Sequence, residues 1–69
     1  MSFPVFNYRW AEITVKHAHQ SSNPEQFLRG VEQEVRQMQD HSTANRTMDL
    51  LKERYKTLYG IWPLDASNN

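Results

Sequence analysis

The sequence predicts a small all-α protein, and three observations support this fold class. The chain has only 69 residues, which is enough for one core and hence for a single domain over residues 1–69. Polar and helix-breaking residues divide it into three segments, each with apolar residues at spacings of three and four. Its eight acidic and eight basic side chains are interspersed, as on solvated helix faces. We expect a small three-helix bundle or a helical hairpin, completed by oligomerisation because so short a chain builds a weak core.

The first segment is compatible with two structures. As a helix over about residues 8–20, it pairs Glu12 with Lys16 and forms one long apolar stripe. This stripe consists of Phe3, Phe6, Trp10, Ile13 and His17. As a strand, residues 3–10 would satisfy the local preference of aromatic and β-branched residues for extended structure. The helical pattern continues farther along the chain, although residues 3–10 stay open between strand and helix.

The second segment predicts a helix over about residues 24–40. Asn23 is a suitable N-cap, and Pro24 fits the first helical position because its missing N–H would have no partner there. Two acid-first pairs at i,i+4 stabilise the polar side; they are Glu25 with Arg29 and Glu32 with Arg36. The apolar stripe consists of Leu28, Val31, Val35 and Met38, widened by Phe27.

The third segment predicts a helix over about residues 44–59, with Ser42, Thr43 or Asn45 as its cap. Gly60 is placed to end it in a left-handed conformation, and residues 63–69 are expected to form a polar tail. The apolar stripe consists of Met48, Leu51, Tyr55, Leu58 and Trp62.

Composition excludes several classes of protein. The absence of cysteine rules out disulfides, thiolate metal sites and cysteine nucleophiles. A net charge of zero argues against a protein that binds nucleic acid through a basic surface. No apolar run approaches the length of a membrane span, and the N-terminus does not resemble a signal peptide, so we expect a soluble cytoplasmic protein.

Catalytic and metal-binding patterns are weak. His17, His19 and His41 are the only histidines, and residues two apart on a helix do not converge on one metal ion. There is no glycine-rich phosphate loop and no nucleophile elbow. We therefore expect no enzymatic activity, no cofactor, no metal and no catalytic residue.

Aromatic placement is the most informative feature. Tyr and Trp side chains gather at the end of the third helix beside basic residues, a composition typical of binding hot spots. The candidate partner-binding residues are Trp10, Ile13, Arg54, Tyr55, Lys56, Tyr59 and Trp62. The aromatic cluster could equally complete the core of the monomer. The leading hypothesis is a protein-protein interaction module that acts as a regulator, inhibitor or accessory subunit, as a homodimer or within a larger complex.

A second hypothesis comes from residues 6–10. This stretch resembles the β-ribbon of ribbon-helix-helix repressors, in which an Asn and an Arg two residues apart point into the major groove. The resemblance covers five residues and implies a dimeric transcriptional regulator in which Asn7 reads adenine and Arg9 reads guanine. The neutral charge of the chain counts against it.

Overall fold

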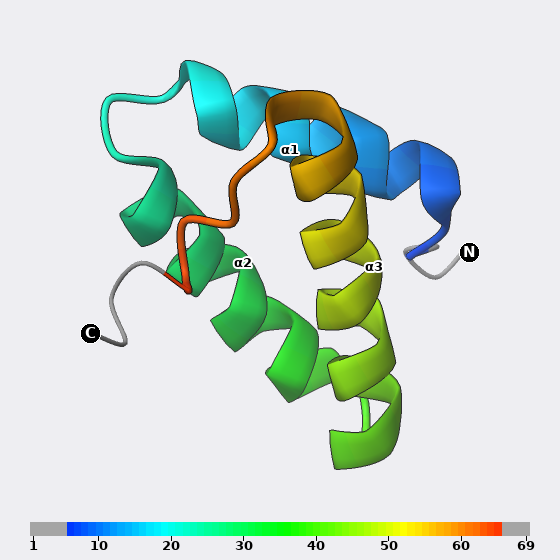
Figure 1. Cartoon of the computed structure of the whole chain (residues 1–69). Coiled ribbons are helices and arrows are strands. Elements are labelled where there is room, and N and C mark those ends of the chain that lie inside the picture. Colours follow the sequence, from blue (N-terminus) through cyan, green and yellow to red (C-terminus); the bar gives the residue numbers. More distant parts are fainter. Residues whose placement is uncertain (1–5, 66–69) are drawn as a thin grey trace.

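The structure, a computed structural model, describes residues 6–65, which form three α-helices and no strand. Helix α1 spans Tyr8–Gln20, α2 spans Pro24–Met38 and α3 spans His41–Tyr59. All three pairs of helices are in contact, so the all-α prediction is confirmed, in the form of a bundle. In Figure 1, α2 and α3 diverge from the turn that joins them, and α1 lies across the molecule near their other ends.

Side-chain caps explain where α1 and α2 begin. The Oδ1 atom of Asn7 accepts a hydrogen bond of 2.9 Å from the backbone N–H of Trp10. Asn23 does the same for Gln26 at 3.1 Å, with Pro24 as the first helical residue. Each cap satisfies an N–H that has no partner inside the helix. Capping by Asn7 makes the start of α1 helical, so residues 8–10 are not a strand, while residues 1–5 lie outside the described part.

The turn between α2 and α3 is tighter than the sequence suggested. Helix α2 ends at Met38, where residue 40 was expected, and α3 begins at His41, where about residue 44 was expected. The N-cap is Asp40, whose carboxylate accepts from the N–H of Thr43 at 3.5 Å. A hydrogen bond from the side chain of Thr43 is the largest cause of the lowered pKa of the Asp40 carboxyl, and the backbone N–H of Thr43 lowers it further. An acidic cap also interacts favourably with the positive end of the helix dipole.

The core lies where the three helices meet. The small residues Ala11, Val15 and Ala18 bring α1 close to its neighbours. Leu28 from α2 and Leu51 and Tyr55 from α3 are fully buried against them. The stripe expected on α1 is therefore not the buried one, because the buried face lies about 100° farther around that helix.

Residues after α3 return to the core. Gly60 ends the helix with φ of 77°, the left-handed conformation expected at this position. The chain then runs between α2 and α3, visible in orange and red in Figure 1. Trp62 is buried there and packs edge-on against Tyr55, with 5.9 Å between ring centroids. The aromatic cluster thus belongs largely to the core of the chain.

The three predicted i,i+4 ion pairs are present on the helix surfaces. They join Glu12 to Lys16 at 3.2 Å, Glu25 to Arg29 at 3.3 Å and Glu32 to Arg36 at 3.2 Å. Such exposed pairs contribute about 0.3 to 0.5 kcal/mol each.

Candidate functional site

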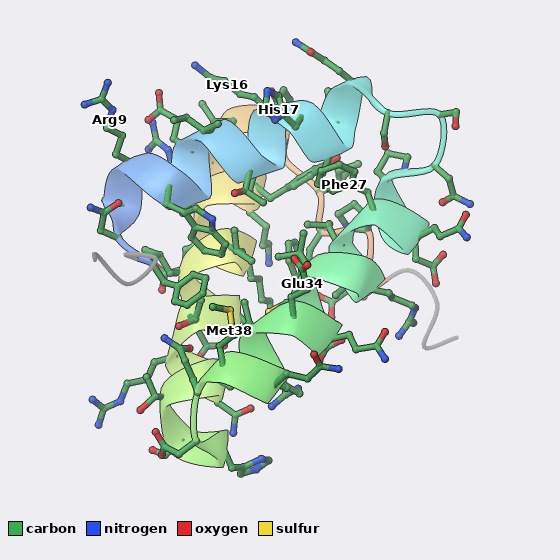
Figure 2. The ribbon with its side chains drawn as sticks, turned by 180° about the vertical axis from the view of Figure 1, so that it is seen from behind. Arg9, Lys16, His17, Phe27, Glu34 and Met38 are labelled. Carbon is green, nitrogen blue, oxygen red and sulfur yellow. The ribbon has the colours of Figure 1, made fainter. Side chains whose placement is uncertain are left out.

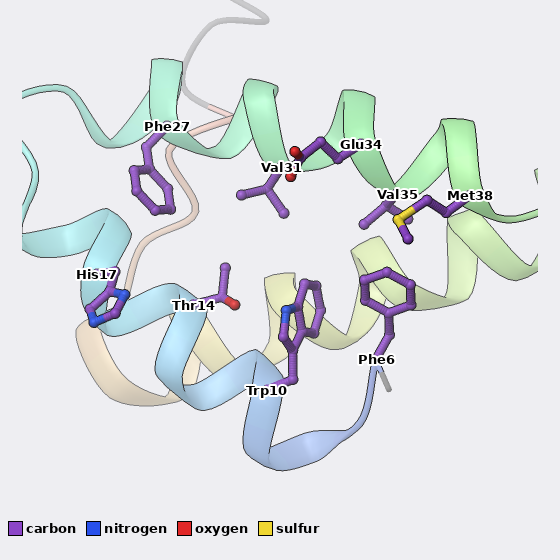
Figure 3. A pocket seen from close by; sticks show the side chains of 9 residues that line it. All are labelled: Phe6, Trp10, Thr14, His17, Phe27, Val31, Glu34, Val35 and Met38. Atoms are coloured by element: carbon purple, nitrogen blue, oxygen red, sulfur yellow. The ribbon is translucent and has the colours of Figure 1, made fainter. Parts of the chain in front are cut away.

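A groove of about 360 Å³ lies between α1 and α2, on the face of the molecule opposite residues 60–65. Its walls come from both helices, and their side chains project toward one another in Figure 3. The groove is lined by Phe6, Trp10, Thr14, His17, Phe27, Val31, Glu34, Val35 and Met38. We call this surface, together with Ile13 at its edge, the α1-α2 groove.

The α1 wall is the aromatic stripe that the sequence placed on this helix. Phe6 and Trp10 are half-buried and meet edge to face, with 4.8 Å between ring centroids. Ile13 and His17 continue the stripe by spacings of three and four, and Ile13 is 47% exposed. Ala11, Val15 and Ala18 supply the fully buried α1 part of the core, and Trp10 packs against that core from the side. The outer part of the stripe, with Ile13 and His17, faces solvent.

The α2 wall is formed by the edge of the stripe predicted for that helix. Leu28 and Val35 are buried, whereas Val31 is half-buried. Phe27 is 37% exposed and Met38 is 56% exposed, at the two ends of the wall. Large apolar side chains thus remain accessible on both sides of one groove, a concentration typical of interaction surfaces.

The charges beside the α1-α2 groove differ between its two walls. Arg9 and Lys16 project from the outer edge of α1, and Glu34 projects from α2 over the groove (Figure 2). Lys16 is paired with Glu12 of its own helix. Arg9 and Glu34 are exposed and make no ion pair or hydrogen bond within the described residues. Basic side chains therefore flank the α1 wall of the groove, and one carboxylate, that of Glu34, lies on its α2 wall.

The structure separates the seven predicted partner-binding residues into groups. Tyr55 is fully buried and Trp62 nearly so, so neither offers surface in this conformation. Tyr59 is half-buried and stacks on His19, with 3.8 Å between ring centroids. Trp10 and Ile13 belong to the α1-α2 groove.

The two basic residues of that prediction lie on α3, outside the groove. Arg54 donates hydrogen bonds of 2.8 Å to the hydroxyl of Tyr8 and to the carboxylate of Glu12. Its guanidinium also lies over the Tyr8 ring, 4.9 Å from the centroid. Arg54 thus fastens the start of α1 to α3, while Lys56 is exposed.

The residues of the DNA-binding hypothesis also have defined positions. Asn7 uses its side-chain oxygen to cap α1, and Arg9 lies on the surface of that helix. The paired strand that such a ribbon requires is replaced by helix from Tyr8 onward. Asn7 and Arg9 therefore do not project from a strand here.

The histidines are dispersed. His17 lines the groove, His19 faces α3, and His41 is the first residue of that helix. Among residues 6–65, no group of three His, Cys, Asp or Glu side chains could hold a metal ion. In the same range, no helix combines the length and apolar character needed to cross a bilayer.

Of the residues that line the groove, the sequence prediction named only Trp10 as a site residue. The two predicted stripes contained Phe6, His17, Phe27, Val31, Val35 and Met38, but periodicity alone does not show which apolar residues of a stripe remain exposed. Glu34 and Thr14 were in neither stripe. Comparisons with protein-family models, with curated proteins and with solved structures give no match for this chain.

Proposed function

We propose that this protein is a small helical protein-protein interaction module and that the α1-α2 groove is its contact surface. In this role it would act as a regulator, inhibitor or accessory subunit of the protein it binds. The observation that supports the proposal is the accessible apolar surface of the α1-α2 groove, where Ile13 is 47% exposed and Met38 is 56% exposed. Burying apolar surface of this kind is the main driving force of protein association.

The composition of the groove favours a protein as its occupant. Trp, Phe and Met are enriched where proteins bind one another, and they form most of both walls here. The accessible apolar surface also extends past the groove itself, to Ile13 on one edge and Met38 at one end. Sites for small molecules enclose most of the ligand, so a small molecule bound in the groove would leave Ile13 and Met38 exposed.

Site-specific photo-crosslinking in the cells of origin tests the proposal. A photoreactive amino acid would replace Ile13 at the edge of the groove, and in a matched control it would replace Ile61, which is 54% exposed outside the groove. We expect a discrete protein adduct from position 13 that is absent from position 61. An adduct destroyed by nuclease, or no protein adduct from position 13, would contradict the proposal.

A further inference from the structure

We propose that the occupant of the α1-α2 groove is a second copy of this chain, related to the first by a two-fold axis. This inference rests on the proposed function and identifies its partner. In the dimer, α1 of each copy covers α2 of the other, so that the two grooves close on each other and form one buried layer of four helices.

The distribution of charge at the groove supports this partner. A two-fold interface brings the same patch of both copies together, so every surface must complement itself. Placing α1 over α2 of the other copy brings the basic side chains beside the α1 wall, Arg9 and Lys16, toward the Glu34 carboxylate on the α2 wall. The exposed charges of Arg9 and Glu34 have no partner among residues 6–65 of the single chain. This arrangement provides one for each of them in both copies.

The apolar surface is likewise divided between the two walls. The α1 wall presents Trp10 and Ile13, and the α2 wall presents Phe27 and Met38. When α1 of one copy lies over α2 of the other, bulky apolar groups meet on both sides of the axis. A net charge of zero means that two copies meet without long-range repulsion.

The first test is sedimentation equilibrium of the full chain over a wide concentration range. We expect reversible monomer-dimer association for the wild type. Ile13→Asp should weaken the association by about tenfold or more, because a carboxylate would replace an apolar side chain that α2 of the other copy covers. Ile61→Asp makes the same change at an exposed site outside the groove and should leave the dissociation constant unchanged. Circular dichroism would show that both variants keep their helices.

The second test exchanges the charges. Glu34→Arg gives a chain with basic groups at both walls of the groove, and Arg9→Glu gives one with acidic groups at both walls. Each variant alone should have a dimer dissociation constant about tenfold higher or more. An equimolar mixture should form heterodimers, because opposite charges then meet at both α1-α2 contacts of the dimer. The exposed α3 residues provide the control, with Arg46→Glu and Glu53→Arg expected to dimerise like the wild type.

The results distinguish this inference from the proposed function. A wild type that stays monomeric, or a dimer that is indifferent to Ile13→Asp and to both groove charge changes, would overturn the inference. A crosslinked adduct from position 13 with the mass of two chains supports it. An adduct with a different protein would overturn the second copy as occupant while leaving the interaction module standing.

Discussion

At the scale of single residues, the hydroxyl of Tyr55 is a polar group placed inside the core. The ring is fully buried, yet its oxygen lies 2.9 Å from Nδ1 of His19, so the buried polar atom is satisfied. His19 is held in place by stacking on Tyr59. Burial and then the neighbouring Tyr59 raise the pKa of Tyr55 above its ordinary value of 10.0.

We predict that Tyr55→Phe lowers the free energy of unfolding by about 1 kcal/mol at neutral pH, the usual net value of one hydrogen bond. The raised pKa of Tyr55 means that its protonated hydroxyl contributes to stability below the unfolded pKa near 10.0. This contribution to the free energy of unfolding is lost as the pH rises through the pKa of the folded state. The difference between wild type and variant should therefore shrink above that pH. Urea denaturation of both proteins across alkaline pH measures it. Tyr59→Phe, which keeps the stacked ring, should change neutral-pH stability by less than about 0.5 kcal/mol.

Glu12 illustrates how surface charges tie α1 to α3. The hydrogen bond from Lys16, followed by the positive charge of Arg54, lowers the pKa of this carboxyl below its usual 4.5. Its contribution to stability is consequently present above that pH and lost as pH falls through the lowered folded value.

We predict that Lys16→Ala raises the pKa of Glu12 toward its ordinary value, because the hydrogen bond that lowers this pKa most is removed. Carboxyl resonances followed by NMR during an acid titration give this value directly. Lys52→Ala removes a cation that pairs with Asp65 instead, at 3.9 Å, and serves as the control. An unchanged Glu12 titration in Lys16→Ala would show that Lys16 does not stabilise the carboxylate in solution.

At the scale of elements, the three helices were predictable because each carries its own periodicity and start signal. Asn23 with Pro24 defines α2 before any tertiary contact is considered. The start of α3 was predicted wrongly, since the sequence offered Ser42, Thr43 or Asn45 as the cap. The cap is Asp40, which accepts from the N–H of Thr43, and several polar residues in this stretch are competent caps.

The limit of sequence prediction is clearest on α1. Two stripes run along this helix, one of large aromatic residues and one containing Ala11, Val15 and Ala18, and the smaller residues form the core. Small side chains let two helices approach more closely, so the size of the apolar residues does not by itself show which stripe of α1 forms the core. The sequence therefore proposed Trp10 and Ile13 as partner-binding residues but could not pair them with the α2 wall, because that pairing depends on how the helices cross.

The two glycines should respond in opposite directions to the same substitution. Gly30 lies inside α2, and a Cβ atom there would meet nothing within 4 Å in the single chain. We predict that Gly30→Ala stabilises the monomer by about 1 kcal/mol, the difference in helix propensity. Gly60→Ala should destabilise it by about 1 to 2 kcal/mol, since its φ of 77° is unfavourable for a residue with a Cβ atom. Chemical denaturation at low protein concentration tests both, and equal effects would contradict the assigned backbone roles.

At the scale of the whole molecule, the protein has more apolar surface than one core can use. A chain of 69 residues buries a small fraction of its surface compared with larger domains. Here the core takes one face of each helix, and Trp10 both packs against that core and lines the groove together with Phe6. Association through the groove would bury the apolar surface that the core leaves accessible.

Thermal stability should consequently depend on protein concentration. If folding is coupled to dimerisation through the α1-α2 groove, mass action stabilises the folded state, and the Tm of the wild type should rise as the concentration is raised. Ile13→Asp should remove this dependence and lower the Tm at high concentration toward that of the wild type at low concentration. Ile61→Asp should retain the dependence, because its exposed side chain lies outside the groove. Calorimetry over a roughly hundredfold range of protein concentration resolves the shift, since 1 kcal/mol moves the Tm of a domain this small by about 4 to 8 °C. A Tm that is independent of concentration for all three proteins would mean that the monomer is stable on its own and that the groove contributes nothing to folding.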